Sequence, residues 1–298
     1  MTLFTGLSAF PLTPVDDAGR LVPDLLQRFL DRIVGAGADS IGLLGSTGAY
    51  AYLSPEARKR TLRAAVEVVA GRTPLVVGVG ALTTAEAESL ARDAREGGAD
   101  GLLLAPMSYQ PLSDEEVFRH FEAVAGAGGL PLCIYNNPTT TKFTFGTDLI
   151  ARLSEVPNIA AVKMPLPADG DFTGEVLRLR GITPKGFAVG YSGDWGAKEA
   201  LFAGGACWFS VVAGLLPGPA VALTRAVQSG DIDTAERLDR AFGPVWSLFR
   251  EFGSFRVMFS IAEILGLGSL RPPRPILPLA ERDLDRVAQA LDRLLDEA

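Results

Sequence analysis

The residue with the clearest chemical potential in this sequence is Lys163. It lies in the run Ile159–Met164, whose other members are all apolar, in a chain that holds only five lysines against 23 arginines. Strand alternation places Lys163 on the same face as Ala161. Desolvation there would favour the neutral amine, which can attack a ketone and form an imine. The same pattern also fits a lysine at a strand end that reaches solvent.

Three polar segments follow other strand-like runs. Gly45–Gly48 offers backbone N–H groups and the hydroxyls of Ser46 and Thr47 to an anion such as a carboxylate. Tyr135–Pro138 brings a phenol that could transfer protons, and Ser192–Asp194 is a further polar turn. Each segment alone also fits an ordinary turn or, for the tyrosine, a packed aromatic ring.

Short apolar runs alternate with helix-length amphipathic segments, which is typical of repeated βα units and a parallel sheet. Eight such runs indicate a (β/α)8 TIM barrel of the α/β class rather than an open doubly wound sheet, and barrel active sites lie at the carboxyl ends of the strands. The predicted strands are Gly6–Phe10, Ser40–Leu44, Pro74–Val79, Gly101–Ala105, Pro131–Asn136, Ile159–Met164, Gly186–Tyr191 and Cys207–Val212.

Helical patterns continue beyond the eighth predicted strand. They cover Asp231–Phe252, Phe255–Leu265 and Glu281–Asp296, with a proline-rich connector at residues 272–275. We therefore expect a catalytic barrel over residues 1–222 and a C-terminal helical extension over residues 223–298. Two helix starts are also predicted, at Ser54 and at the capping box that begins with Ser113.

Composition excludes several functional classes. The formal charge of −7 is spread along the chain, so no basic stripe indicates binding to nucleic acid or membrane lipid. No apolar run approaches a membrane span and the first ten residues lack a basic start, so we expect a cytoplasmic protein. His120 is the only histidine, which argues against multi-histidine metal sites and histidine-based triads. Cys133 and Cys207 are predicted to be buried and reduced.

Several landmarks, in this order, resemble the dihydrodipicolinate synthase and N-acetylneuraminate lyase family. They run from Gly6 to about Pro217: the segment Ala9–Pro14, the Gly45–Gly48 loop, Tyr135-Asn136 before Pro138, Val162-Lys163, Gly193-Asp194 and Phe209–Val211.

The resemblance implies roles for these residues. The lysine matching Lys163 forms the imine with a 2-oxo acid, usually pyruvate, and residues matching Ser46 and Thr47 hold its carboxylate. The tyrosine matching Tyr135 relays protons, so we assign Lys163, Tyr135 and Ser46 as catalytic. Gly193 and Phe209 join the expected substrate-binding residues. The resemblance implies no metal or organic cofactor, and it implies a homotetramer or homodimer.

Two departures from the family pattern bear on the second substrate. Where dihydrodipicolinate synthases usually supply an arginine for the carboxylate of aspartate semialdehyde, this chain has Thr140. The tyrosine usually lent to a neighbouring subunit is Ser108 here, with Tyr109 one place later. We place Thr140 and Tyr109 among the expected substrate-binding residues. Tyr109 would reach the neighbouring subunit by a shifted loop; the alternative is that the enzyme does not need this tyrosine.

The sequence therefore predicts a Schiff-base lyase, aldolase or dehydratase. Its substrate would be pyruvate or another 2-oxo acid, such as a 2-keto-3-deoxy sugar acid. One alternative is a true 4-hydroxy-tetrahydrodipicolinate synthase. A second is a protein that binds a keto acid without turning it over.

Overall fold

Eight parallel strands close into a barrel in the computed structural model, which describes residues 3–297. The strands follow one another around the ring in chain order, and β1 pairs with β8 to close it. Their bounds are β1 Gly6–Ala9, β2 Ser40–Leu43, β3 Leu75–Gly78, β4 Gly101–Leu104, β5 Leu132–Tyr135, β6 Ile159–Met164, β7 Ala188–Tyr191 and β8 Cys207–Ser210. The predicted TIM barrel is confirmed, with strand ends shortened by no more than two residues.

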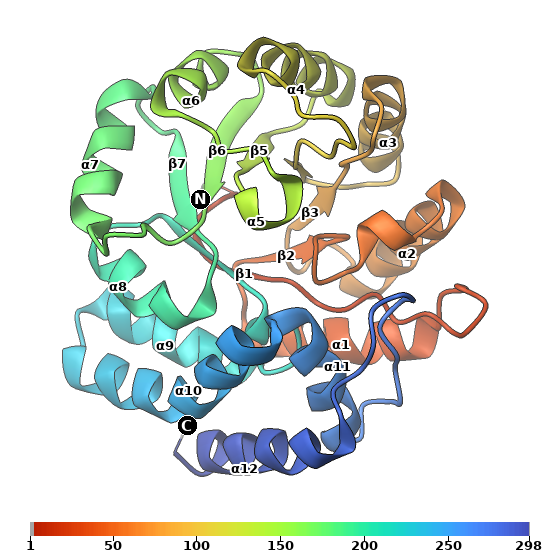
Figure 1. Cartoon of the computed structure of the whole chain (residues 1–298), viewed down its shortest axis with the longest axis vertical. Coiled ribbons are helices and arrows are strands. Elements are labelled where there is room, and N and C mark those ends of the chain that lie inside the picture. The colour runs from red at the N-terminus through yellow and green to blue at the C-terminus, as the bar shows by residue number, and fades with distance from the viewer. Residues whose placement is uncertain (1–2, 298) are drawn as a thin grey trace.

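Helices surround the strands in the ring that Figure 1 shows from one end of the barrel. They are α1 Pro23–Ala36, α2 Pro55–Val69, α3 Thr84–Glu96, α4 Asp114–Gly128, α5 Pro138–Thr141, α6 Thr147–Ser154, α7 Phe172–Ile182, α8 Ala197–Phe202, α9 Pro217–Ser229, α10 Ile232–Phe252, α11 Ser254–Ile264 and α12 Glu281–Glu297. Short 3-10 turns occupy Tyr50–Tyr52, Asp194–Gly196 and Val212–Gly214.

Local sequence explains where two of the helices begin. The Ser54 hydroxyl accepts the Ala57 N–H at 3.2 Å, and Pro55 takes the first helical position, where no N–H is needed. Ser113 and Glu116 form the reciprocal capping box at the start of α4. Both starts are as the sequence predicts.

The apolar core has two layers. The larger layer lies between strands and helices, where outward-facing strand residues such as Ile41 and Val162 meet helix residues such as Phe29 and Leu149. A smaller cluster fills the barrel and includes Phe10, which packs edge-on against Phe209. Strand alternation produces this division, because successive side chains point to opposite sides of the barrel wall.

The C-terminal helices α10, α11 and α12 pack beside α9 and α1, in blue in Figure 1. Trp208 on β8 reaches Trp246 on α10 with ring centroids 6.4 Å apart, and Trp246 stacks on Phe242 at 4.5 Å. Trp208 is therefore a core residue. The division between residues 1–222 and 223–298 stays a prediction, and α9 spans its boundary. Within residues 3–297, no helix is long and apolar enough to cross a membrane.

An ion-pair network ties α8 to α10. The Lys198 amine lies 2.9 Å from Glu236, 3.2 Å from Glu199 and 3.5 Å from Asp239. Desolvation alone would lower the pKa of Lys198, but the three carboxylates raise it above its ordinary value. Because only 11% of this side chain is exposed, these pairs are less screened than surface pairs.

We predict that Lys198→Met lowers the free energy of unfolding by about 2 kcal/mol, the scale of lost hydrogen bonds to a charged group. The substitution keeps the apolar stem and removes the charge that holds three carboxylates together. Urea unfolding followed by circular dichroism measures the change. The control is Lys59→Met, whose more exposed pair with Asp93 contributes less. Equal losses in the two variants would contradict this account.

Candidate active site

Three aromatic rings surround the Lys163 amine inside the barrel. Its Nζ lies 4.1 Å from the ring centroid of Tyr135, 4.2 Å from that of Phe10 and 5.6 Å from that of Phe209. Tyr135 and Lys163 are register partners on β5 and β6, so the strand pairing itself sets them side by side. Only 4% of Lys163 is exposed. The lysine is therefore buried at the end of its strand, and the alternative of a fully solvated amine is wrong.

Glycines make room for these rings, because they have no side chain. A Cβ added to Gly42 would lie 2.2 Å from the Phe10 ring, and one added to Gly45 would lie 2.6 Å from it. On the other side, a Cβ on Gly190 would lie 2.6 Å from the Phe209 ring. Gly190 is also the register partner of Lys163 on β7. These three glycines let the rings close around the amine.

The Tyr135 phenol is oriented by its own loop. Asn137 Nδ2 donates to the Tyr135 hydroxyl oxygen at 2.9 Å, which leaves the hydroxyl proton free to be donated elsewhere. The neighbouring Asn136 is buried, and its side-chain oxygen accepts the Phe145 N–H at 3.4 Å. The loop after β5 is thus fixed, and it presents a phenol beside the amine.

The loop after β2 presents Ser46 and Thr47 at the same end of the barrel. Leu44 and Ala49, on either side of them, adopt positive φ angles of 55° and 54°, a strained conformation for residues with side chains. Gly78 on β3 allows the loop to approach, since a Cβ there would lie 1.9 Å from the Leu44 carbonyl oxygen. Within residues 3–297 neither hydroxyl has a protein hydrogen-bond partner. Both remain available to an anion.

A buried carboxylate fixes the ends of β7 and β8. Asp194 accepts N–H groups from Trp208 at 2.9 Å, Val211 at 3.1 Å and Val212 at 2.7 Å. Desolvation raises the pKa of Asp194, against the opposing effect of these donors and of the nearby Lys163 charge. Gly193 precedes it with a φ of 92°, a conformation that favours glycine. These hydrogen bonds to Asp194 fix the backbone beside Phe209.

The expected site residues divide into two groups. The structure brings Lys163, Tyr135 and Phe209 into contact, and it places Ser46, Thr47 and Gly193 on loops at the carboxyl ends of β2 and β7. Thr140 is exposed on α5, and its hydroxyl donates to the Asn137 carbonyl oxygen at 3.3 Å. Tyr109 is 89% exposed. Neither Thr140 nor Tyr109 contacts Lys163 within this chain.

Both cysteines are buried and unpaired, as predicted. Burial raises the pKa of the Cys133 and Cys207 thiols, so neither is a reactive thiolate.

Four further residues, for which no individual role was predicted, lie at or near the site. Phe10 and Asn137 contact the lysine and the phenol, as described. Tyr50, which begins the turn after the Ser46-Thr47 loop, is 8% exposed. Lys142, at the end of α5, is an exposed cation, and α5 lies over the centre of the ring in Figure 1. In the sequence, Phe10 and Asn137 lie within the segments Ala9–Pro14 and Tyr135–Pro138, and Tyr50 and Lys142 each follow such a segment closely.

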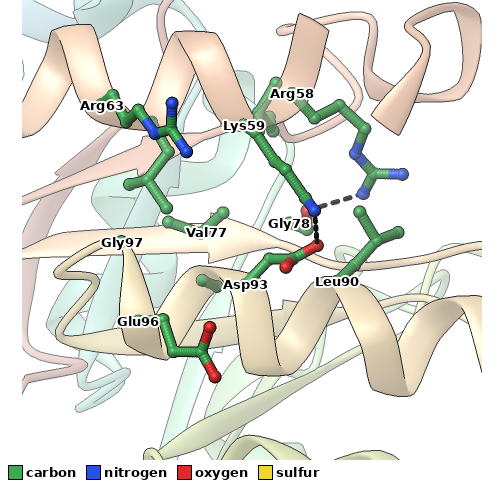
Figure 2. A pocket seen from close by; sticks show the side chains of 12 residues that line it. Arg58, Lys59, Arg63, Val77, Gly78, Leu90, Asp93, Glu96 and Gly97 are labelled. Atoms are coloured by element: carbon green, nitrogen blue, oxygen red, sulfur yellow. Dashed lines mark hydrogen bonds and ion pairs between the residues drawn. The ribbon is translucent and has the colours of Figure 1, made fainter. Parts of the chain in front are cut away.

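A separate cavity of about 130 Å³ lies outside the barrel, between α2 and α3. Figure 2 shows Lys59 and Asp93 meeting across it, with 3.0 Å between their charged atoms. Arg58 borders this cavity and donates to the Gly78 carbonyl oxygen at 2.8 Å. The three rings around Lys163, which we call the aromatic cage, belong to Phe10, Tyr135 and Phe209, and none of these residues lines this space.

The arrangement suits imine chemistry. A desolvated amine is placed beside a phenol, and two free hydroxyls on a neighbouring loop can hold a carboxylate. A 2-oxo acid carries a carbonyl and a carboxylate on adjacent carbons, which fits these two sets of groups.

Comparison with known proteins agrees with this geometry. The model of the dihydrodipicolinate synthetase family matches residues 3–294. The 4-hydroxy-tetrahydrodipicolinate synthase of Gluconacetobacter diazotrophicus is 34% identical over 295 residues, covering 97% of each chain. That of Azoarcus sp. is 35% identical over 296 residues, covering 97% of this chain and 98% of the relative.

Among solved structures, dihydrodipicolinate synthase from Agrobacterium tumefaciens is 55% identical, with a TM-score of 0.97 and 98% of each chain covered. The match extends over barrel and C-terminal helices alike. The chain belongs to the dihydrodipicolinate synthetase family, and it is a lyase of the class I aldolase type.

Proposed function

We propose that Lys163 forms an imine with pyruvate or a closely similar 2-oxo acid. The observation that carries this proposal is the aromatic cage, in which Tyr135 and Phe10 lie about 4 Å from the amine. Ser46 and Thr47 would hold the carboxylate through their hydroxyls and backbone N–H groups. The buried amine then faces the carbonyl carbon of the bound acid.

The chemistry follows from these positions. The amine nitrogen of Lys163 attacks the carbonyl carbon, and the resulting carbinolamine loses its hydroxyl as water to give a cationic imine. Tyr135 donates its O–H proton to the carbonyl oxygen, which becomes the carbinolamine hydroxyl, and takes a proton from the attacking nitrogen in return. It then donates that proton to the departing hydroxyl, which leaves as water, and solvent restores the Tyr135 proton. The imine withdraws electrons, so the adjacent methyl group loses a proton and the carbon can bond to an aldehyde.

For the second step we propose condensation with aspartate semialdehyde, as in 4-hydroxy-tetrahydrodipicolinate synthase. The names of the relatives favour this alternative over the lyase that the sequence first indicated. Lys142 offers a cation directly after α5, the short helix on which Thr140 stands in place of the usual arginine. Its amine donates to the Thr139 carbonyl oxygen at 2.8 Å and is otherwise exposed. Thr140 itself favours the second candidate, cleavage of a 2-keto-3-deoxy sugar acid.

We also propose a homo-oligomer, a dimer or tetramer. Leu82 and Tyr109 are 61% and 89% exposed on successive βα loops. Leu82 lines a cavity of about 370 Å³ together with Met107, Ser108 and Leu112, and Tyr109 follows Ser108 in the chain. A second copy of the chain would cover these apolar groups, and Tyr109 would then face the neighbouring subunit.

We infer a cytoplasmic location. Both thiols of this chain are unpaired, and an interior that contains free cysteines suits a reducing compartment. The proposed 2-oxo acid substrate is a metabolite of central metabolism.

Borohydride reduction in the presence of pyruvate should attach reduced pyruvate to Lys163. Mass spectrometry of the digested protein identifies the modified peptide. Lys163→Ala should lose the adduct and all turnover, whereas the exposed Lys185→Ala should retain both. Absence of an adduct on the unaltered protein, or full activity of Lys163→Ala, would overturn the imine mechanism.

Pyruvate and aspartate semialdehyde together should be consumed by the protein, and Lys142→Ala should raise KM for the semialdehyde about tenfold or more, the scale of one lost charged contact. An assay that couples the condensation product to its enzymatic reduction measures both the turnover and the KM for the semialdehyde. The KM for pyruvate should hardly change, and Lys185→Ala again serves as the control. Cleavage of a 2-keto-3-deoxy sugar acid without semialdehyde turnover would favour the second candidate.

Leu82→Asp should convert the oligomer to a smaller species, because it buries a charge in the proposed interface. Light scattering after size-exclusion chromatography measures the mass. Leu295→Asp changes an exposed leucine on α12 and should leave the mass as it is. A monomeric unaltered protein, or an unchanged mass for Leu82→Asp, would refute this interface.

A further inference from the structure

We propose that Asn137 is a positioning residue for the reaction, because its amide holds the Tyr135 hydroxyl so that the phenol proton stays available for the carbonyl of the bound 2-oxo acid. The inference rests on the proposed imine chemistry of Lys163 and deepens it. The role of Asn137 is indirect, since it acts through the phenol.

The backbone fixes where the Asn137 side chain begins. The Asn136 N–H donates to the Lys163 carbonyl oxygen at 3.0 Å, so the chain leaves β5 still paired with the strand of the lysine. Pro138 then keeps the residue before it out of the helical conformation, and Asn137 has a φ of −137° and a ψ of 75°. The Asn137 side chain therefore starts from a restrained backbone two residues after the phenol.

This side chain does not cap the helix that it precedes. Asparagine is favoured at such a position because its side-chain oxygen can accept an N–H of the first turn. Among the residues that the structure describes, no such bond forms at the start of α5. The backbone carbonyl oxygen of Asn137 accepts the N–H groups of Thr140 at 3.1 Å and Thr141 at 3.0 Å. The amide is thus left for Tyr135, and its Nδ2 donates to the hydroxyl oxygen at 2.9 Å.

The hydrogen bond from Asn137 restricts the direction of the phenol proton. A phenol oxygen carries one proton and can also accept hydrogen bonds. Since the Asn137 N–H approaches the Tyr135 oxygen from one side, the phenol proton must point elsewhere. The same oxygen can therefore donate to the substrate carbonyl and then take a proton from the Lys163 nitrogen, as the proposed mechanism requires.

The hydrogen bond is strongest while the phenol proton is away. After Tyr135 has given its proton to the carbonyl oxygen, its own oxygen is negatively charged until it takes the proton of the nitrogen. Only 6% of Tyr135 is exposed, so little water can stabilise this charge. A hydrogen bond to an ionised oxygen is about twice as strong as one to a neutral oxygen. Asn137 therefore favours this stage over the bound ground state, and its loss should lower kcat rather than raise KM.

The test compares two substitutions that keep the branched shape of the side chain. Asn137→Leu removes the donor, and kcat should fall about tenfold, the scale of one lost hydrogen bond, with KM for pyruvate nearly unchanged. Asn137→Asp replaces the donor by a carboxylate that accepts the phenol proton, and kcat at neutral pH should fall about 100-fold. The rate at which the pyruvate methyl protons exchange for deuterium, followed by NMR, gives both parameters.

Lowering the pH distinguishes a donor from a merely structural side chain. As the pH falls towards the ordinary range of a carboxyl group, roughly pH 4, the introduced carboxyl gains a proton and can donate to the phenol as the amide does. The exchange rate of Asn137→Asp, relative to the unaltered protein at the same pH, should therefore rise. The relative rate of Asn137→Leu should stay constant. A relative rate of Asn137→Asp that does not change with pH, or unaltered rates in both variants, would overturn the proposal.

Two controls complete the test. Thr139→Asp adds an exposed carboxylate two residues along the same loop and should match the unaltered protein, whereas a loss equal to that of Asn137→Asp would overturn the proposal. In a Tyr135→Phe background, Asn137→Leu should cause no further loss, because the bond that it removes is already gone, and an undiminished loss there would also count against the proposal. Absence of borohydride labelling on Lys163 in the unaltered protein would instead refute the imine chemistry on which the inference rests.

Discussion

The structure depends on keeping one amine, that of Lys163, out of water inside a closed barrel. An amine so buried would be costly if it faced only aliphatic side chains. Here Phe10, Tyr135 and Phe209 present ring faces to it, and an aromatic face attracts the ammonium form without supplying a counter-ion. Within residues 3–297 the amine is surrounded by these rings and makes no ion pair with a carboxylate.

Support for this cage comes from outside the barrel as well as inside. Asp194 fixes the ends of β7 and β8 by accepting three N–H groups, one of them from Trp208. Trp208 in turn packs on Trp246 of α10. The C-terminal helices are thus coupled through two tryptophans to the strand that carries Phe209. These helices support the position of β8 by packing, although none of the residues around Lys163 belongs to them.

Much of this architecture follows from local patterns. Short apolar runs predicted all eight strands, and strand alternation placed Ala161 and Lys163 on one face of the sixth. Register then brought Tyr135 beside Lys163. Contacts between distant strands were not predictable. The sequence around Phe10 or Tyr50 does not indicate which residues its ring contacts in the fold. The same holds for Thr140, whose side chain turns to its own loop because α5 forms there.

Four glycines around the mouth carry no functional group, yet the site cannot be assembled around even a methyl group at Gly42, Gly45, Gly78 or Gly190. In a library of random variants these positions should therefore behave like the lysine itself, with almost every replacement lost. Redesign of the site has correspondingly little freedom at these four positions. The adjustable part of the enzyme is the loop and short helix after β5, where Thr139, Thr140 and Lys142 face solvent.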